Sequence, residues 1–215
     1  MSLLGYDPRV YYRGRGSIEA RSMEIPVAEN EVVFRCNLVT VRDGRMHSYS
    51  SGYISNQESH ELVGALNDAL GNHDVTFFPG ISYRHICRLA GRTETLQASC
   101  TPAHDIPGAP IAGHMPTGQG AEFLRDLMAR SVDVLARHPV NKSREERGDP
   151  PANMIWLWSP GRKPTMPAFA DKIGLTGAAI SAVNLVRGIA RLIGWDIVRV
   201  PGATGYVDTD FAAKG

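Results

Sequence analysis

The sequence predicts an α/β fold, a single compact domain in which a mixed β-sheet is flanked by helices. Two observations carry this prediction. Segments rich in β-branched residues alternate with segments whose apolar residues recur at helical spacing, and glycine and proline concentrate in the connections. The chain has 215 residues, 43% hydrophobic and 21% charged, which is enough to bury a core.

Six strands and three helices are expected. The strands cover residues 31–41, 45–49, 75–78, 81–89, 153–158 and 197–200, and the helices cover residues 55–70, 123–135 and 176–193. A turn at residues 43–44 joins the first two strands as a hairpin, and Ser55 with Glu58 forms a capping box at the start of the first helix. Alternation within the fourth strand directs Arg84 and His85 to opposite faces of the sheet.

The balance of charge excludes some classes of partner. Lys and Arg total 23 against 22 for Asp and Glu, so we expect no binding to nucleic acid or to an acidic membrane. The uncharged stretch at residues 173–186 is too short to cross a bilayer, and no basic-then-apolar leader opens the chain. We therefore expect a soluble, cytoplasmic protein. The three cysteines match no zinc or redox spacing, which predicts free thiols.

Two arginines are in positions that indicate anion binding. Arg15 lies between glycines, where the backbone can approach a ligand and a guanidinium can grip a carboxylate or phosphate; a turn with a solvated arginine is the alternative. Arg35 lies in an apolar strand beside Asn37, and a buried charge requires a partner. This partner is either a structural carboxylate or a ligand, and the sequence leaves both open.

Two polar pairs lie in segments that proline stiffens, namely His104 with Asp105, and His138 with Asn141. Rigid loops hold functional groups well, although loop hydrogen bonding explains each pair equally simply. The sequence contains no HExxH, GxSxG, P-loop or strand-linked GxGxxG pattern. Metalloprotease, esterase, P-loop NTPase and dinucleotide-binding functions therefore have no motif in their favour.

A series of short motifs spans nearly the whole chain. The motifs are, in order, Leu3-Leu-Gly-Tyr-Asp-Pro-Arg9, Tyr12-Arg-Gly-Arg-Gly-Ser-Ile-Glu-Ala20, Phe34-Arg-Cys-Asn37, Tyr83-Arg-His85, His104-Asp-Ile106, His138-Pro-Val-Asn141, Pro151-Ala-Asn-Met-Ile-Trp156, Gly174-Leu-Thr-Gly-Ala178 and Pro201-Gly-Ala-Thr-Gly205. In this order they resemble the archaeal-type cofactor-independent phosphoglycerate mutases, members of the alkaline phosphatase superfamily.

The resemblance implies a metal-dependent isomerase of glycolysis that transfers a phosphoryl group through a phosphoserine. In that family a phosphatase-like domain carries two divalent metal ions, of the Mn or Zn type, and the serine nucleophile, while a cap domain closes over the substrate. The segments that carry the metal ligands and the nucleophile lie before and after the part that this chain resembles. We therefore expect a truncated middle part of a longer enzyme, inactive alone, that itself holds no metal and no catalytic serine.

On this basis residues 1–20 lead out of the phosphatase-like domain, residues 21–200 form the cap, and residues 201–215 lead back. The expected partners are 3- or 2-phosphoglycerate and the phosphatase-like domain, and a second copy of the chain is a further candidate. The predicted substrate-binding residues are Arg15, Arg35, Asn37, Arg84, His85, His104, Asp105, Asn141 and Lys214.

The sequence departs from the family pattern at one position. Residues 51–54 read Ser-Gly-Tyr-Ile, where the archaeal mutases often have Gly-Arg-Ile. The loss of that arginine leaves two alternatives open: a homoserine-kinase-like phosphotransferase of the same superfamily, and a ligand-binding module without catalysis.

Overall fold

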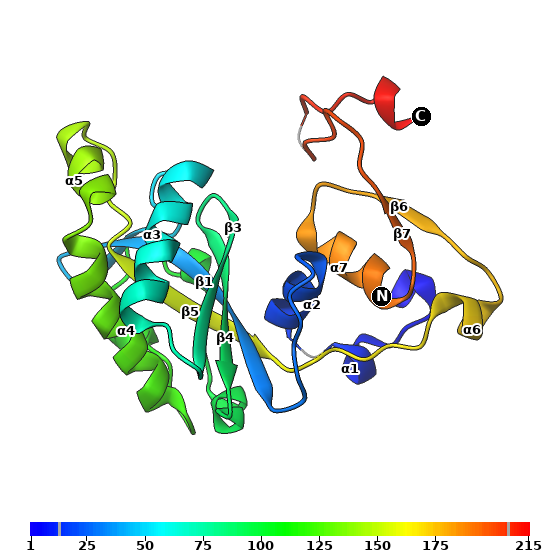
Figure 1. Cartoon of the computed structure of the whole chain (residues 1–215), viewed down its shortest axis with the longest axis horizontal. Helices are drawn as coiled ribbons and strands as arrows, with labels where there is room; N and C mark the ends of the chain where they lie inside the picture. The colour runs from blue at the N-terminus through cyan, green and yellow to red at the C-terminus, as the bar shows by residue number, and fades with distance from the viewer. Residues whose placement is uncertain (13, 206) are drawn as a thin grey trace.

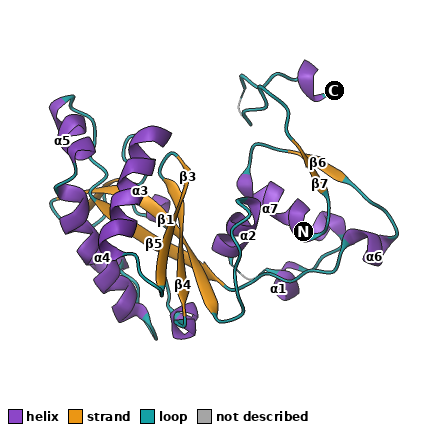
Figure 2. Cartoon of the chain, viewed as in Figure 1, coloured by secondary structure: helices purple, strands orange, loops and turns teal. Residues whose placement is uncertain are grey.

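The longest strand, β1 (Glu31–Arg42), is the centre of a five-stranded sheet in the computed structural model, which describes residues 1–12, 14–205 and 207–215. It pairs with β2 (Arg45–Ser48), β4 (Arg84–Ala90) and β5 (Met154–Gly161), and β3 (Val75–Ile81) pairs with the far side of β4. All of these pairings are antiparallel. Figure 2 shows these strands crossing in one twisted layer.

Helices α3 (Asn56–Leu70), α4 (Ala121–Ala136) and α5 (Pro139–Glu146) lie on one side of this sheet (Figure 1). Phe34 and Leu38 of β1 are fully buried in the apolar core that these helices share with the sheet. Burial of this one sheet face is the main source of stability in this part of the fold. The opposite face of the sheet is therefore left to the rest of the chain.

A smaller lobe contributes to that opposite side. Its elements are α1 (Pro8–Tyr11), α2 (Arg15–Ser22), α6 (Phe169–Ile173), β6 (Ala178–Ile180), α7 (Asn184–Leu192) and β7 (Asp196–Val198), and the two short strands pair in parallel. Helix α2 packs against α7, β1 and β5, so it joins the small lobe to the sheet (Figure 1). Short 3₁₀ helices cover Ser2–Leu4, Thr93–Gln97, Ala103–Asp105, Ile111–His114 and Ala212–Lys214.

Two glycines allow α2 to approach its neighbours closely. A Cβ atom on Gly16 would lie 2.9 Å from the Ser159 carbonyl oxygen and 3.0 Å from that of Val33. A Cβ atom on Gly188 of α7 would lie 2.0 Å from the carbonyl oxygen of Ile18. Any larger side chain at either position would push α2 away from the sheet or from α7.

The α/β class, with a sheet flanked by helices, is confirmed, although the main sheet is antiparallel throughout and the parallel pair is separate from it. The hairpin of β1 and β2, the capping box at Ser55 and the opposite directions of Arg84 and His85 are also confirmed. The strand predicted over residues 153–158 is present as β5, which begins at Met154 and extends to Gly161.

Three predicted elements were wrong. Residues 176–193 are not one helix, because 178–180 form a strand and only 184–192 are helical. The strand predicted over 81–89 is interrupted: Ser82, with a positive φ of 54°, turns the chain between β3 and β4. The loop expected around Asn141 is helical, since Pro139 occupies the first turn of α5 and supplies the fixed φ that a helix start accepts.

The segment expected to lead out of another domain, residues 1–20, contributes to the apolar cluster of the small lobe. Tyr6, Met166 and Ile193 are buried together in an apolar cluster that is separate from the main core. Residues near the N-terminal end of the chain therefore pack with residues 166–193.

Candidate functional site

A cavity of about 270 Å³ lies on the sheet face opposite α3 and α4. Five of the predicted site residues line it, namely Arg15, Arg35, Asn37, Arg84 and His104. Tyr49, Tyr83 and Trp158 complete the lining. The three arginines therefore converge on one small space, although they come from α2, β1 and β4.

The register of the strands explains this convergence. Arg35 is paired with Trp158 of β5, and Asn37 is paired with Arg84 of β4. Directly opposed residues in antiparallel strands project from the same face. Arg35, Asn37 and Arg84 therefore lie on the same face of the sheet, the face that carries the cavity.

Arg35 is almost completely buried, with 4% of its side chain exposed. Its Nε lies 3.2 Å from Oε2 of Glu19, a contact that is electrostatic but lacks hydrogen-bond geometry. Burial lowers the pKa of Arg35 to about 10, against the attraction of Glu19, and the nearby charges of Arg15 and Arg84 lower it further. The sequence left open whether Arg35 contacts a structural carboxylate or a ligand. In the structure it contacts the carboxylate of Glu19 and also lines the cavity, where a ligand can reach it.

Arg15 is placed by the first turn of α2 rather than by a loop. Its backbone NH donates to Oγ of Ser159 at 3.1 Å, and its Nε donates to Oε1 of Glu19 at 2.7 Å. About one third of its side chain remains exposed. Glu19, one helical turn away, thus contacts both Arg15 and Arg35 through its two oxygens.

Arg84 has no carboxylate partner among residues 1–12, 14–205 and 207–215. Its guanidinium carbon lies 5.3 Å from the centroid of the Tyr83 ring, which holds it by a cation–π contact. The charge of Arg84 is therefore available to a ligand in the cavity.

Aromatic rings form the walls of the cavity. His104 packs edge-on against Trp158 and Tyr49, with ring centroids 5.1 and 6.4 Å apart. Trp158 Nε1 donates to Oδ1 of Asn37 at 3.2 Å, and the amide of Asn37 donates to the Tyr49 carbonyl at 3.4 Å. Asn37 therefore holds Tyr49 and Trp158 in the cavity wall through its side-chain amide.

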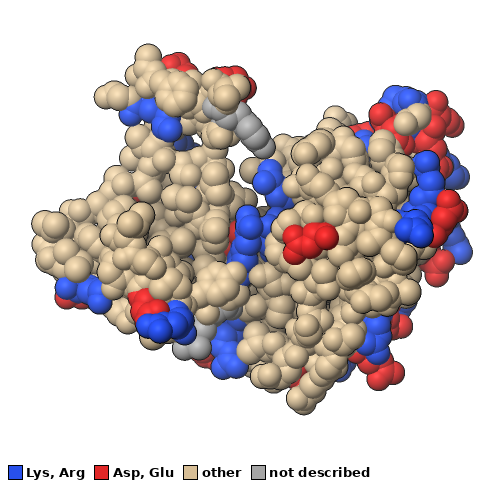
Figure 3. Space-filling view, turned by 180° about the vertical axis from the view of Figure 1, so that it is seen from behind, with Lys and Arg blue, Asp and Glu red and all other residues tan. Residues whose placement is uncertain are grey.

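A second cavity of about 260 Å³ adjoins the first and shares Arg15 and Arg84 with it. Glu19, Asn184 and Gly205 also line this second space. Figure 3 shows basic side chains gathered in the hollow between the two lobes. Two connected spaces on either side of the same pair of arginines suit a ligand that carries two anionic groups.

Four predicted residues are not brought to the first cavity. His85 is buried on the other face of the sheet, where its Nδ1 accepts from the Gly80 NH at 3.0 Å and burial lowers its pKa to about 3. Asp105 is exposed and points to His104 at 3.6 Å without lining the cavity. Lys214 is exposed near the end of the chain, where its Nζ stacks over Phe211.

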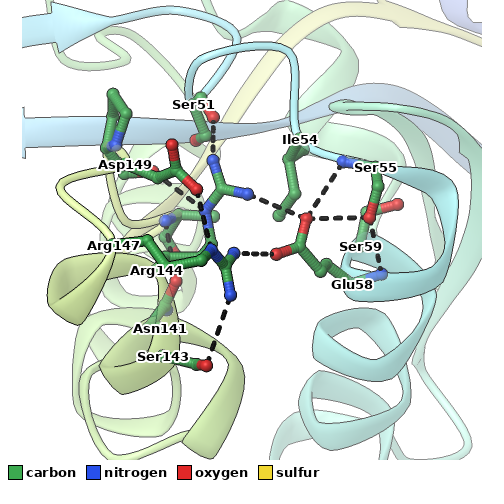
Figure 4. A network of polar contacts seen from close by, with 12 residues as sticks. Ser51, Ile54, Ser55, Glu58, Ser59, Asn141, Ser143, Arg144, Arg147 and Asp149 are labelled. Atoms are coloured by element: carbon green, nitrogen blue, oxygen red, sulfur yellow. Dashed lines mark hydrogen bonds and ion pairs between the residues drawn. The ribbon is translucent and has the colours of Figure 1, made fainter.

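Asn141 is the fourth such residue, and it has a structural environment. Its amide donates to the carbonyls of Leu135 and Ala152, both at 2.9 Å, and its Oδ1 accepts from the Ala152 NH at 2.8 Å. It lies on α5 beside a network in which Glu58 binds Arg144 and Arg147 (Figure 4). These contacts tie α5 to α4, to the segment that precedes β5 and to α3.

Sequence reasoning missed Glu19, Tyr49 and Tyr83. The spacing of four residues between Arg15 and Glu19 was the available signal, but it applies only to a helix, and the glycines on either side of Arg15 indicated a turn. The two tyrosines carried no signal in the sequence, since isolated aromatic residues most often belong to a core.

No group of three or more His, Cys, Asp or Glu side chains that could hold a metal ion is present among the described residues. The residues at the cavity are cationic and aromatic, which is the wrong donor set for a divalent cation. The described helices include none that is long and apolar enough to span a bilayer.

Comparisons with known proteins agree with the resemblance seen in the sequence. A statistical model of the 2,3-bisphosphoglycerate-independent phosphoglycerate mutase family matches residues 1–141. Over the whole chain, the sequence is 48% identical to the mutase of that name from Methanothrix thermoacetophila and 45% identical to a probable one from Geobacter sulfurreducens. The chain covers 53% and 54% of these two proteins, so it spans about half the length of the curated relatives it matches.

Two solved structures resemble the fold. The cofactor-independent phosphoglycerate mutase from Thermoplasma acidophilum matches 94% of this chain and 56% of its own, with a TM-score of 0.63 and 28% identity. The PH0037 protein from Pyrococcus horikoshii matches 99% of this chain and 49% of its own, with a TM-score of 0.73 and 25% identity. With the match of the family model to well over half of the sequence, these findings show that the chain belongs to the 2,3-bisphosphoglycerate-independent phosphoglycerate mutase family.

Proposed function

We propose that this chain is the substrate-binding part of a phosphoglycerate mutase, an isomerase of glycolysis that interconverts 3-phosphoglycerate and 2-phosphoglycerate through a phosphoserine. The observation that carries the proposal is the convergence of Arg15, Arg35 and Arg84 on one cavity with no carboxylate in its lining. Phosphoglycerate carries a carboxylate and a phosphate, and both are groups that guanidinium ions bind in bidentate fashion.

The arrangement suits binding and orientation. Arg35 is fixed by burial and by the aromatic wall, while Arg15 and Arg84 face both connected cavities. Once the phosphoryl group has moved to the serine, glycerate held by its carboxylate against these arginines can present its two hydroxyl groups in turn to the phosphoserine. Phosphoryl transfer depends mainly on such positioning and on neutralisation of charge. Asn37 and His104 support the aromatic wall behind the substrate.

The remaining parts of the reaction are assigned to another part of the enzyme. No group of three or more His, Cys, Asp or Glu side chains that could hold the two divalent metal ions expected for this family is present among the described residues, and we assign these ions and the nucleophilic serine to another domain. We propose that residues 1–20 and 201–215 connect this chain to the phosphatase-like domain that holds them, and that the sheet lobe closes over the substrate. Lys214 would then approach the substrate from the phosphatase side. An enzyme acting on a soluble metabolite of this kind belongs in the cytoplasm.

A homoserine-kinase-like phosphotransferase is the second candidate, and Tyr53 is the observation that favours it. Tyr53 stands where the archaeal mutases often have arginine, and its hydroxyl lies 3.2 Å from that of Tyr49 at the cavity wall. The aromatic group removes one potential contact to phosphate from this side. An amino alcohol would need less positive charge there than phosphoglycerate does.

An assay of turnover separates the two candidates. The longer protein that we propose contains this chain is supplied with 3-phosphoglycerate and, separately, with homoserine and ATP, in the presence of Mn²⁺ or Zn²⁺. Formation of 2-phosphoglycerate without ATP supports the mutase, and phosphohomoserine formation supports the kinase. The 215-residue chain alone is expected to be inactive with 3-phosphoglycerate, and turnover by it would contradict the division of labour proposed here.

A further inference from the structure

We propose that Glu19 is a positioning residue that aims the anion-binding arginines and directs the anion into the cavity over the sheet. This inference rests on the proposed function, because it concerns the same arginines, and it assigns a role to a carboxylate in a site that binds anions. A carboxylate beside such a site repels the ligand, so its presence there requires an explanation.

The first support is the geometry of the contacts. Glu19 contacts Nε of Arg15 at 2.7 Å through Oε1 and Nε of Arg35 at 3.2 Å through Oε2. The Nε of Arg15 donates a hydrogen bond to Glu19, and the Nε of Arg35 faces the carboxylate as an ion pair without hydrogen-bond geometry, so in both arginines the terminal Nη groups are left for a ligand. The Nη atoms of Arg35 make no hydrogen bond to any residue within 1–12, 14–205 and 207–215. One carboxylate thus sets the rotation of two guanidinium planes.

The second support is the rigidity of the mount. Only 8% of the Glu19 side chain is exposed, and its helix is pressed against the sheet at Gly16 without room for a Cβ atom. A charged side chain that is buried on a closely packed helix has few alternative rotamers. Glu19 is accordingly rigid enough to hold the more exposed side chain of Arg15 in one orientation.

The third support is the distribution of charge between the two connected cavities. Glu19 lines the cavity next to α7 but not the cavity over the sheet, and Arg15 and Arg84 line both. The cavity over the sheet has Arg35 in addition. The negative charge of Glu19 therefore disfavours an anion in the cavity next to α7 and leaves the cavity over the sheet as the stronger site.

The test compares Glu19→Gln with Glu31→Gln as a matched control. Glu31 lies on β1, contacts Nε of Arg88 at 3.4 Å, has 13% of its side chain exposed and lines neither of the two cavities. Binding of 3-phosphoglycerate and of inorganic phosphate to the 215-residue chain is measured by calorimetry, and urea unfolding reports stability for both variants.

A positioning role and a simple charge-balancing role predict opposite changes in anion affinity for Glu19→Gln. If Glu19 aims the arginines, Glu19→Gln weakens binding of both anions by at least ~10-fold, as expected when a binding group is misplaced. Glu31→Gln then retains wild-type affinity even if it loses stability. If Glu19 merely neutralises buried charge, its removal leaves affinity unchanged or raises it, because the pocket becomes more positive. Unchanged or tighter binding overturns the proposal.

A second variant covers the case in which Glu19→Gln does not fold. Glu19→Asp keeps the charge but is one methylene shorter and cannot reach both Nε atoms, so weakened binding supports positioning and wild-type binding contradicts it. The proposed function fails separately: a wild-type chain that binds phosphate but not phosphoglycerate contradicts the function while the Glu19 effect on phosphate still tests this inference. Binding of neither anion by the wild-type chain contradicts both.

Discussion

The guanidinium carbon of Arg35 lies 4.6 Å from the centroid of the Trp158 ring, directly across the β1–β5 pairing. The aromatic face stabilises the cation from one side while Glu19 contacts it from the other. A buried cation between these two groups retains its charge at neutral pH although burial lowers its pKa to about 10. The guanidinium of Arg35 therefore provides a positive charge in the candidate site at neutral pH.

The first prediction concerns the pH dependence of anion binding. Because the pKa of Arg35 is about 10, its charge is lost as the pH rises through that value, whereas an exposed arginine stays charged. The affinity of the wild-type chain for 3-phosphoglycerate should therefore fall between about pH 9 and 11. Calorimetric titrations at several pH values measure this change.

The Arg35→Gln variant isolates the contribution of Arg35 from that of tyrosines that titrate in the same range. It should bind more weakly at pH 8 and lose less affinity between pH 9 and 11 than the wild type does. Parallel pH profiles for the two proteins would show that Arg35 does not titrate in this window.

The second prediction concerns the contact of α2 with the sheet. In Gly16→Ala, the new Cβ atom would lie within about 3 Å of three backbone atoms, so α2 must move outward and carry Arg15 with it. We expect a loss of about 1–3 kcal/mol in the free energy of unfolding, as for other overpacked sites, together with weaker anion binding. Urea unfolding and calorimetry measure the two effects. Gly44→Ala, at an open turn position with a positive φ, is the control for backbone strain alone.

The third prediction separates Asn141 from the site. Asn141→Ala removes three buried hydrogen bonds and leaves backbone groups of Leu135 and Ala152 without their partner. The free energy of unfolding should fall by about 1–3 kcal/mol for each buried group left unsatisfied. Affinity for 3-phosphoglycerate should stay at the wild-type value under conditions where the variant is folded. A selective loss of affinity at unchanged stability would return Asn141 to the list of binding residues.

The fourth prediction concerns stability in acid. Burial, with a smaller effect of the neighbouring His60, lowers the pKa of His85 to about 3. Between the ordinary histidine pKa of about 6.5 and that value, the unfolded chain binds a proton that the folded chain does not. The free energy of unfolding should therefore fall as the pH is lowered from 6.5 toward 3.

The His85→Gln variant, which keeps an acceptor for the Gly80 NH, should lose less stability over this range than the wild type. Urea unfolding at pH 7 and at about pH 4.5 provides the comparison. An equal loss in both proteins would show that other groups control the acid response.

The sequence predicted the elements whose signals are local. The opposite directions of Arg84 and His85, the turn at residues 43–44 and the capping box at Ser55 each depend on a few neighbouring residues, and all are confirmed. Alternation also separated Arg84 from His85, and only Arg84 reaches the cavity. The roles assigned to the site residues themselves remain predictions.

Other features depend on contacts between distant segments. Residues 176–183 have helix-compatible composition, yet residues 178–180 pair with β7. The glycines around Arg15 indicated a turn, but they allow α2 to lie against the sheet. Glu19 could be recognised as a partner of Arg35 only once α2 was placed on β1. Tertiary packing overrode local preference in each case.

The central claim is that Arg15, Arg35 and Arg84 form one site for a small organic anion. A calorimetric titration of 3-phosphoglycerate into the 215-residue chain and its Arg35→Ala variant tests it most directly, with Arg88→Ala, on the same sheet face but outside the cavity, as the control. The account predicts that Arg35→Ala lowers affinity by ~10²-fold while Arg88→Ala leaves it unchanged. Equal affinity of the wild type and Arg35→Ala would contradict the account.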